Sequence, residues 1–235
     1  MSAGRYLIVN ADDFGQSPGV NRGVIQAYEH GIVTSATLMV RWPAAQEAAE
    51  FAREHPDLSV GLHLDLGEWE YVDGGWRARY EVVDTADPAA VEAQVEQQIE
   101  TFTRLGGSEP THLDSHQHVH REEPVRSSLR RAGERLSVPV RHLAGGIHYR
   151  GDFYGQDGRG WPVPDAITGP ALLGLLEALP EGVTELGCHP GEPDGLESTY
   201  LTERLTEVAT LCDPRVLAAV DRFGIRLCSF VEVRS

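Results

Sequence analysis

Short apolar segments alternate along the chain with segments that carry helix-start and helix-stop residues, and this alternation constrains the fold most. In the first 64 residues we predict a strand at 6–9, a helix at 18–30, a strand at 34–40, a helix at 43–55 and a strand at 58–64. Ser17 and Pro18 suit the start of the first helix, and Gly31 suits its end. A β-α-β-α-β order predicts parallel strands joined by right-handed crossovers.

The rest of the chain continues this alternation around two insertions. We predict further helices at 88–105, 122–136 and 169–179, one or two helices across 199–223, and further strands at 111–116, 138–143, 184–188 and 226–231. Residues 67–87 and 144–168 fit neither pattern, and their glycines and aromatic residues favour a loop excursion on the ligand side and a lid. The sequence therefore predicts an α/β protein with about seven parallel strands, folded as a single domain over residues 1–235.

Composition narrows the classes of partner. Twenty Lys and Arg against 36 Asp and Glu give a formal net charge of −16, and no stretch is rich in Lys or Arg. Binding of nucleic acid or of an anionic membrane needs clustered cations, so neither partner is expected. Three cysteines without CxxC spacing favour free thiols, and no apolar leader or membrane-spanning run is visible, so we expect a cytoplasmic protein. The sequence leaves a homodimer open.

Two adjacent carboxylates, Asp12 and Asp13, directly follow the first strand, and Gly15 then lets the chain turn. In parallel α/β sheets, the carboxyl ends of the strands carry the loops that form a ligand site. Two neighbouring negative charges there are unfavourable without a cation or a shared proton, which predicts a metal ion. The alternative is an ordinary Asx turn after a strand, since Asp and Gly are common turn residues.

The segment 111–120 concentrates titratable side chains at alternate positions. They are His112, Asp114, His116, His118 and His120. On an extended strand these side chains share one face, where four imidazoles and a carboxylate would make a poor hydrophobic core. Imidazole and carboxylate are common ligands of zinc, iron or manganese, but the segment cannot remain a strand throughout, so only some of the histidines can be ligands. The others could orient ligands or face a substrate, and a solvated histidine-rich edge is the alternative.

Two further strand ends carry a histidine, namely His63 and His189. Either residue alone could be an ordinary core or surface histidine, and Arg141 on an apolar strand could be an edge residue or the partner of a buried carboxylate. One carboxylate and two imidazoles leave positions on an ion open for water. A second carboxylate can then serve as general base, and a free histidine can protonate a leaving group. These groups suit hydrolysis of an amide or ester.

With these residues assembled, the chain resembles the YdjC-like carbohydrate deacetylases, including chitooligosaccharide deacetylases, which are relatives of the NodB-type polysaccharide deacetylases. The resemblance runs through five motifs in order: NADDFG at 10–15, GIVTS at 31–35, GLH at 61–63, THLDSHQHVH at 111–120 and CHPG at 188–191. It covers the chain almost from end to end and implies a distorted (β/α) barrel.

The resemblance also implies roles for individual residues. The metal ligands that it implies are Asp13, His63 and His116. Asp12 would be the general base that deprotonates water, Arg141 would pair with Asp12 and orient it, and His189 would be the general acid that protonates the departing amine. Around this centre, or at the substrate, we expect Asn10, Asp114, His118, His120 and Trp161, with Asp114 as a partner of an imidazole.

The activity that the resemblance implies is removal of N-acetyl groups from amino sugars or short oligosaccharides of the N-acetylglucosamine type. It implies one divalent metal ion, Mg²⁺ or Zn²⁺. Aromatic residues of the two insertions could stack on sugar rings or simply pack the loops. One alternative is a metal phosphoesterase or other hydrolase on the same barrel, although a phosphoesterase usually wants two metal ions and more cationic residues. Another is a sugar-binding relative without catalysis.

Overall fold

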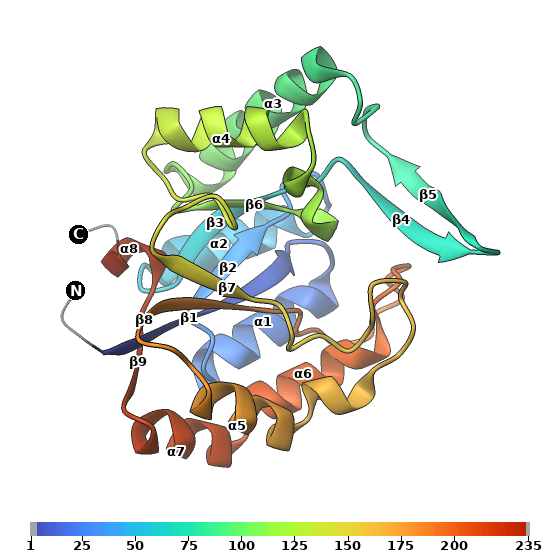
Figure 1. The fold of residues 1–235 in the computed structure, drawn as a ribbon. Coiled ribbons are helices and arrows are strands. Elements are labelled where there is room, and N and C mark those ends of the chain that lie inside the picture. Colours follow the sequence, from blue (N-terminus) through green and yellow to red (C-terminus); the bar gives the residue numbers. More distant parts are fainter. Residues whose placement is uncertain (1–3, 234–235) are drawn as a thin grey trace.

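In the computed structural model, which describes residues 4–233, seven parallel strands form one curled sheet (Figure 1). These strands are β1 (Arg5–Phe14), β2 (Ser35–Leu38), β3 (Ser59–Leu64), β6 (Leu113–Ser115), β7 (Ile147–Arg150), β8 (Gly182–Cys188) and β9 (Ile225–Leu227). Their order across the sheet is β6-β3-β2-β1-β8-β7, and β9 pairs with the first residues of β1. The predicted α/β fold, a distorted barrel of about seven parallel strands, is confirmed.

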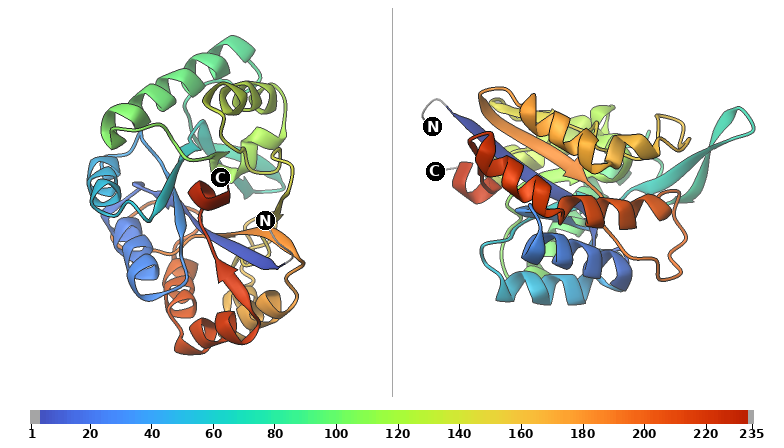
Figure 2. Two further views of the ribbon diagram at one scale, coloured as in Figure 1. Left: turned by 90° about the vertical axis from the view of Figure 1, so that its left-hand side faces the viewer. Right: turned by 90° about the horizontal axis from the view of Figure 1, so that it is seen from below.

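The helices lie around the outside of the sheet, as the left-hand view of Figure 2 shows. They are α1 (Pro18–His30), α2 (Ala45–Glu54), α3 (Pro88–Gly106), α4 (Val125–Leu136), α5 (Gly169–Glu177), α6 (Thr202–Leu211) and α7 (Pro214–Arg222), with the 3₁₀ helices η1 (His116–Arg121) and η2 (Pro164–Ile167). The short α8 (Phe230–Val233) instead lies in the middle of this view, where Phe230 stacks on His112 with ring centroids 3.7 Å apart. Within residues 4–233, no helix has both the length and the hydropathy of a membrane span.

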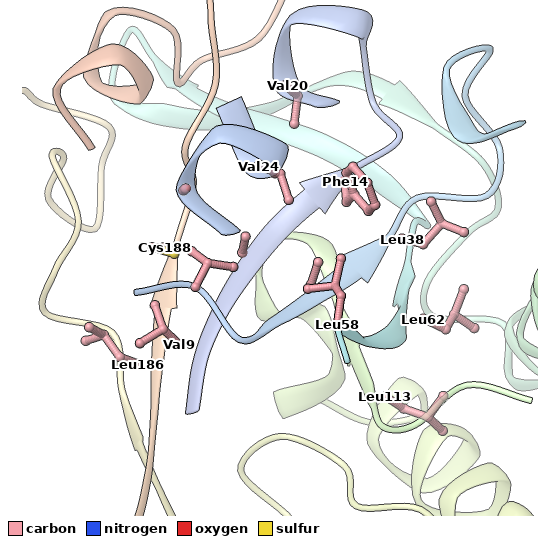
Figure 3. Packing of buried hydrophobic residues seen from close by; sticks show 14 of the residues in the cluster. Val9, Phe14, Val20, Val24, Leu38, Leu58, Leu62, Leu113, Leu186 and Cys188 are labelled. Carbon is pink, nitrogen blue, oxygen red and sulfur yellow. The ribbon is translucent and has the colours of Figure 1, made fainter. Parts of the chain in front are cut away.

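The side chains of β1 alternate between two environments, which shows where the core lies. Leu7 and Val9 are fully buried in the large hydrophobic cluster between the sheet and the surrounding helices (Figure 3). Ile8 belongs instead to a small cluster with residues of α8, so it faces the inside of the curled sheet. Further along the same face, Asn10 and Asp12 are buried and polar. The interior of the sheet is therefore apolar at its amino end and polar at its carboxyl end.

Residues 67–81 form an antiparallel hairpin, so the prediction of a loop excursion over 67–87 was wrong in this respect. The two strands are β4 (Gly67–Val72) and β5 (Gly75–Glu81), joined at Asp73 and Gly74. Both turn residues have positive φ, 52° and 84°, as a two-residue hairpin turn requires. An Asp-Gly pair between alternating residues is the sequence signal for such a turn. The hairpin projects beyond the carboxyl edge of the large sheet, on the right in Figure 1.

The strand predicted at 138–143 is also wrong. Within it, only Val140 forms a bridge, to Leu113 of β6. The side chain of Arg141 points into the polar interior of the sheet, and His142 has a left-handed backbone with φ 64°, which ends the extended conformation. A different strand, β7, forms inside the segment 144–168 that was predicted as an irregular lid, and it pairs with β8 rather than with β6.

The last predicted strand, 226–231, is likewise shorter than expected. β9 ends at Leu227, and α8 begins at Phe230. The backbone N–H of Ser229 donates to Glu232 Oε2 at 2.7 Å, which is one contact of a capping box and satisfies a free donor at the start of this helix. A serine three residues before a glutamate was therefore a helix-start signal within the apolar end of the chain.

Candidate metal centre and catalytic site

The carboxyl ends of the strands open into a cavity of about 660 Å³. Its walls come from the strand ends, from the hairpin β4–β5, and from the segments around residues 151–160 and 198–200. This volume suits a small ligand, since such pockets commonly measure about 300–1,000 Å³. The hairpin therefore lies on the ligand side, where the insertion at 67–87 was expected.

A bulge in β1 turns both Asp12 and Asp13 into this cavity, although neighbouring side chains of a regular strand point to opposite faces. The pairing of β1 with β2 shifts between Ala11 and Phe14, and Asp13 has a left-handed backbone with φ 67°. A non-glycine residue rarely adopts this conformation, and local strain of this kind is concentrated at functional sites. Both carboxylates are buried and line the cavity.

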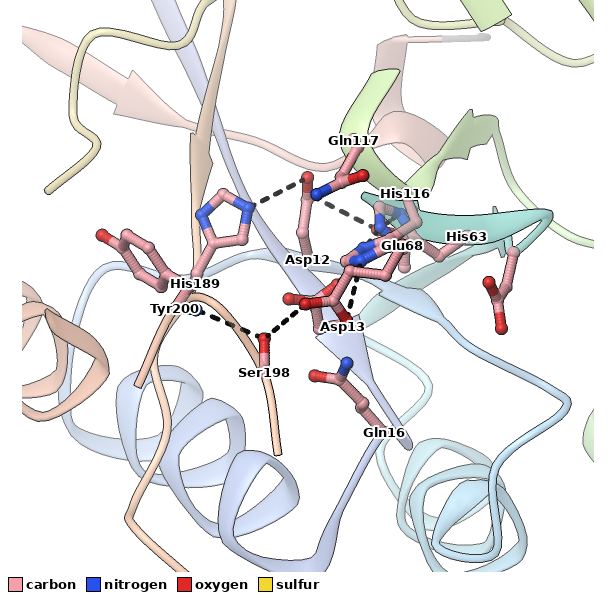
Figure 4. Close-up of polar contacts among 12 residues, drawn as sticks. Asp12, Asp13, Gln16, His63, Glu68, His116, Gln117, His189, Ser198 and Tyr200 are labelled. Carbon is pink, nitrogen blue, oxygen red and sulfur yellow. Dashed lines mark hydrogen bonds and ion pairs between the residues drawn. The ribbon is translucent and has the colours of Figure 1, made fainter. Parts of the chain in front are cut away.

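Asp13, His63 and His116 meet at one point of the cavity (Figure 4). Asp13 Oδ1 lies 3.3 Å from His63 Nε2 and 3.0 Å from His116 Nδ1. One carboxylate and two imidazoles form a common ligand set for a divalent ion and leave coordination positions for water and substrate. The three residues that the family resemblance implies as metal ligands are thus close enough together to bind one ion.

The carboxylates beside His63 and His116 favour a positive charge at the point where the three candidate ligands meet. His63 Nδ1 lies 2.6 Å from Asp114 Oδ1, which keeps the opposite nitrogen, Nε2, free to bind an ion. Burial alone would lower the pKa of both histidines. Asp114 instead raises the pKa of His63 well above its usual value, and Asp13 raises the pKa of His116 to about 9. A bound cation would satisfy the same excess of negative charge, so the donor set fits a metal ion.

Two residues in contact with this centre were not predicted from the sequence. Arg204 of α6 is buried and donates from Nη2 to Asp13 Oδ2 at 2.7 Å, which leaves Oδ1 for an ion. Burial would raise the pKa of Asp13, but Arg204 and His116 hold it well below its usual value. Glu68 of β4 places Oε2 3.8 Å from His116 Nε2, while its Oε1 accepts the Thr199 N–H at 3.0 Å. The hairpin therefore reaches the candidate metal ligands.

Asp12 is held by a fork of hydrogen bonds from Arg141. Arg141 Nη1 donates to Asp12 Oδ2 at 2.6 Å and Nη2 donates to Oδ1 at 2.8 Å. The same guanidinium pairs with Asp114 at 2.8 Å and Glu185 at 2.6 Å. Burial would raise the pKa of Asp12, but the charge and hydrogen bonds of Arg141 hold that pKa well below its usual value. Asp12 is therefore ionised, oriented and exposed to the cavity.

Figure 4 shows His189 and the two histidine donors on opposite sides of Asp12. His189 Nε2 lies 3.7 Å from Asp12 Oδ2. The rings of Tyr154 and Tyr200 pack against the imidazole, with centroids 5.1 and 5.3 Å away. Burial lowers the pKa of His189 to about 4, although Asp12 and Asp13 oppose this shift. His189 is therefore neutral at pH 7, and it must receive a proton before it can act as an acid.

The other residues named from the sequence occupy different surroundings. Asn10 Nδ2 donates to Asp12 Oδ1 at 2.8 Å, so it helps to fix that carboxylate. His118 lines the cavity, whereas His120 is fully buried and is not among the cavity-lining residues. Trp161 is 64% exposed and also lies outside the residues that line the cavity. Of these residues, Asn10 therefore contacts the Asp12 carboxylate and His118 lines the cavity, whereas His120 and Trp161 do neither.

Glu207 of α6 is a buried acid that supports the His189 backbone. The His189 N–H and the Tyr200 hydroxyl both donate to its carboxyl group. Burial, opposed by these hydrogen bonds, raises the pKa of Glu207 from its usual 4.5 to about 8. The unfolded chain then releases this proton near pH 4.5, but the folded chain releases it only near pH 8. The contribution of Glu207 to stability is therefore complete below pH 4.5 and is lost as the pH rises to about 8.

Replacing Glu207 with Gln is expected to flatten the decline in stability between pH 5 and pH 8. A glutamine keeps a hydrogen-bond acceptor but cannot ionise, so up to about 1.4 kcal/mol of pH-dependent loss per pH unit should disappear. Urea unfolding at several pH values measures this slope, with the exposed Glu100→Gln as control. Equal slopes for both variants and the wild type would show that Glu207 titrates normally in the folded chain.

Relatives with curated names match nearly the whole chain. A carbohydrate deacetylase from Geobacillus stearothermophilus is 35% identical in an alignment of 249 positions, which covers 97% of this chain and 98% of that protein. A chitooligosaccharide deacetylase from Salmonella typhimurium is 32% identical in an alignment of 259 positions, which covers 97% of this chain and 99% of that protein. The similarity thus extends well beyond the five motifs.

Solved structures share the fold. A protein from Enterococcus faecalis V583 with a proposed role in cellobiose-phosphate cleavage superposes with a TM-score of 0.80 at 27% identity, covering 98% of this chain and 99% of its own. A family 4 carbohydrate esterase from Streptomyces lividans superposes with a TM-score of 0.56 at 14% identity, covering 97% and 93%, and this likeness concerns the fold alone. The family model described as "YdjC-like protein" matches residues 6–222, and the chain therefore belongs to the YdjC-like family.

Proposed function

We propose that this chain is a metal-dependent carbohydrate deacetylase that removes N-acetyl groups from amino sugars or short oligosaccharides. The observation that carries the proposal is the meeting of Asp13, His63 and His116 beside the ionised Asp12. The curated names of the relatives, carbohydrate deacetylase and chitooligosaccharide deacetylase, support the same reaction and substrate class. The donor set accepts Mg²⁺ or Zn²⁺.

The chemistry follows from the residues around the cavity. An ion held by Asp13, His63 and His116 would acidify water and polarise an acyl carbonyl. Asp12 is ionised and faces the cavity, so it can accept a proton from the attacking water. Arg141 lowers the pKa of Asp12 and so makes its carboxylate a weak base. Asp12 would therefore take a proton readily only from water whose own pKa a bound cation has lowered.

His189 completes a route for this proton. It is neutral at pH 7 and lies 3.7 Å from Asp12, so it can take up the proton that Asp12 has received. The protonated imidazole then becomes a strong enough acid to protonate the departing amine nitrogen as the C–N bond breaks. The water oxygen and its second proton end in acetic acid, which releases that proton to solvent as acetate, one water proton ends on the amine, and both side chains return to their starting states.

Aromatic side chains of the hairpin support a sugar substrate. Trp69, Tyr71 and Trp76 of β4–β5 line the cavity. Flat apolar rings beside a polar centre suit the apolar faces of pyranose rings. Of the cationic residues in the cavity wall, Arg79 pairs with Glu70 at 3.0 Å, and Arg159 lies over the ring of Tyr71. Arg204, the third arginine of the wall, pairs with Asp13, so carboxylates neutralise two of the three cations, which does not favour the phosphoesterase alternative.

Release of acetate from di-N-acetylchitobiose tests the proposal. We expect release by the purified chain to stop after chelation and to return when Mg²⁺ or Zn²⁺ is added. His63→Ala should abolish release, whereas the exposed His148→Ala should leave it unchanged. Equal release of acetate before and after chelation would contradict the metal dependence. No release with either ion, from a chain that binds metal, would contradict the N-acetyl sugar as substrate.

A further inference from the structure

A second histidine cluster lies outside the centre described above, and we propose that it binds a second ion, a zinc-like divalent transition metal. The cluster consists of His118 and His120 of η1 and His142, which follows Arg141. One potential ligand nitrogen of each residue lies within 4.8 Å of those of the other two. The ring centroids are 5.9, 5.3 and 5.6 Å apart. The proposal is independent of the proposed function, which needs only the first site.

Hydrogen bonds orient two of these rings and leave one nitrogen of each unused. His120 Nδ1 lies 2.6 Å from Ser115 Oγ, and His118 Nε2 lies 3.3 Å from the Tyr149 hydroxyl. The remaining nitrogens, His118 Nδ1 and His120 Nε2, are buried and have no hydrogen-bond partner within residues 4–233. The Arg141 carbonyl makes only a weak hydrogen bond with the His120 ring, outside ordinary hydrogen-bond geometry. Buried unpaired nitrogens are costly, and a metal ion would satisfy them.

The donor set selects the class of ion. Three imidazoles without a carboxylate suit zinc and neighbouring transition metals, whereas magnesium prefers oxygen ligands. His142 is exposed, so an ion can enter from solvent and keep a water ligand on that side. The positive charge of Arg141 does not forbid this site, because its guanidinium is paired with Asp12, Asp114 and Glu185.

The position of the cluster indicates what the ion would do. η1 begins with His116, a donor of the first site, and His142 directly follows Arg141, which holds Asp12. Gln117, His118 and His142 have left-handed backbones with φ of 49°, 54° and 64°, which non-glycine residues rarely adopt. An ion bound by both segments would hold these strained turns together. It would thereby fix the two segments that position a metal ligand and the partner of the catalytic base.

Zinc stoichiometry tests this inference. Untagged protein is stripped with chelator, dialysed against zinc alone, and analysed for bound metal. We expect two zinc ions per chain for the wild type and for His148→Ala, an exposed histidine on β7, but one for His142→Ala. Dialysis against magnesium alone should give no more than one ion per chain. One zinc ion per chain in both the wild type and His142→Ala would overturn the inference.

A second pair of variants separates this site from the first. His63→Ala should also bind one zinc ion, and the double variant His63→Ala/His142→Ala should bind none. Cobalt(II) should give visible absorption bands of a histidine-rich site in the wild type and in His63→Ala, and these bands should be lost in His142→Ala. If the bands are lost in His63→Ala and kept in His142→Ala, the second site does not exist, and the proposed function is unaffected. If His63→Ala still binds two ions, the first site is misassigned, and the second one stands.

Discussion

Replacing Asp12 with Asn is expected to lower kcat for deacetylation by about 10²- to 10⁴-fold, the range that a positioned general base contributes. The asparagine has nearly the same shape and keeps an oxygen that can accept a hydrogen bond from Arg141. It loses the negative charge that attracts a proton from water. Asp12 lies outside the proposed donor set of Asp13, His63 and His116, so the variant should bind the first ion nearly as the wild type does.

Acetate release and metal content, measured on the same preparation, check this prediction. The exposed Asp57→Asn serves as a matched control that removes one carboxylate from the surface. Full activity of Asp12→Asn would show that another group accepts the proton, and His189, 3.7 Å away, would be the next candidate. Loss of bound metal together with activity would instead make Asp12 a ligand and leave the base unassigned.

The meeting of Asp13, His63 and His116 could be predicted because each lies at or just after the end of a predicted parallel strand. Parallel strands joined by helices present their carboxyl ends at one edge of the sheet, so residues far apart in sequence become neighbours there. Only a local pattern is needed to recognise such a position. The bulge that turns both Asp12 and Asp13 inward was not visible in the sequence, although the adjacent carboxylates required some such distortion.

Arg204 and Glu68 could not be found in the same way. At the start of α6 and within it, the spacing of Leu201, Leu205 and Val208 suggests an apolar face, but Leu205 is 46% exposed while Arg204 is buried. A helix normally buries its apolar stripe, and the partner of Arg204, Asp13, lies 191 residues away. Glu68 was hidden because the hairpin was taken for a loop, although its Asp-Gly turn was a usable signal.

The strand predicted at 138–143 failed because a distant interaction overrides a local preference. Val138 and Val140 are β-branched and buried, as a strand residue would be. The next residue, Arg141, is drawn inward by carboxylates on three other strands, and the left-handed His142 then ends the extended segment. The local sequence pattern predicts where apolar segments lie. It does not show which of these segments will be ended early by a side chain that pairs with distant buried charges.

Replacing Arg141 with Met is expected to destabilise the fold by about 3–5 kcal/mol at pH 8, because it leaves buried carboxylates without their cation. Asp12, Asp114 and Glu185 all pair with this guanidinium, and all are buried. A methionine keeps the apolar stem, so the loss reports mainly on charge. The exposed pair of Arg135 with Glu96 offers a control, since Arg135→Met should cost about 1 kcal/mol or less.

The pH dependence of this loss distinguishes unpaired charge from poor packing. Without Arg141, the folded-state pKa values of Asp12 and Glu185 should rise, since burial already raises that of Glu185 to about 7 even beside the guanidinium. A group with a raised folded-state pKa contributes stability at low pH that is lost as the pH rises through that pKa. The difference between Arg141→Met and the wild type in urea unfolding, both without metal, should therefore shrink from pH 8 to pH 5. A difference that stays constant over this range would mean that the guanidinium stabilises the fold by packing rather than by neutralising the interior of the sheet.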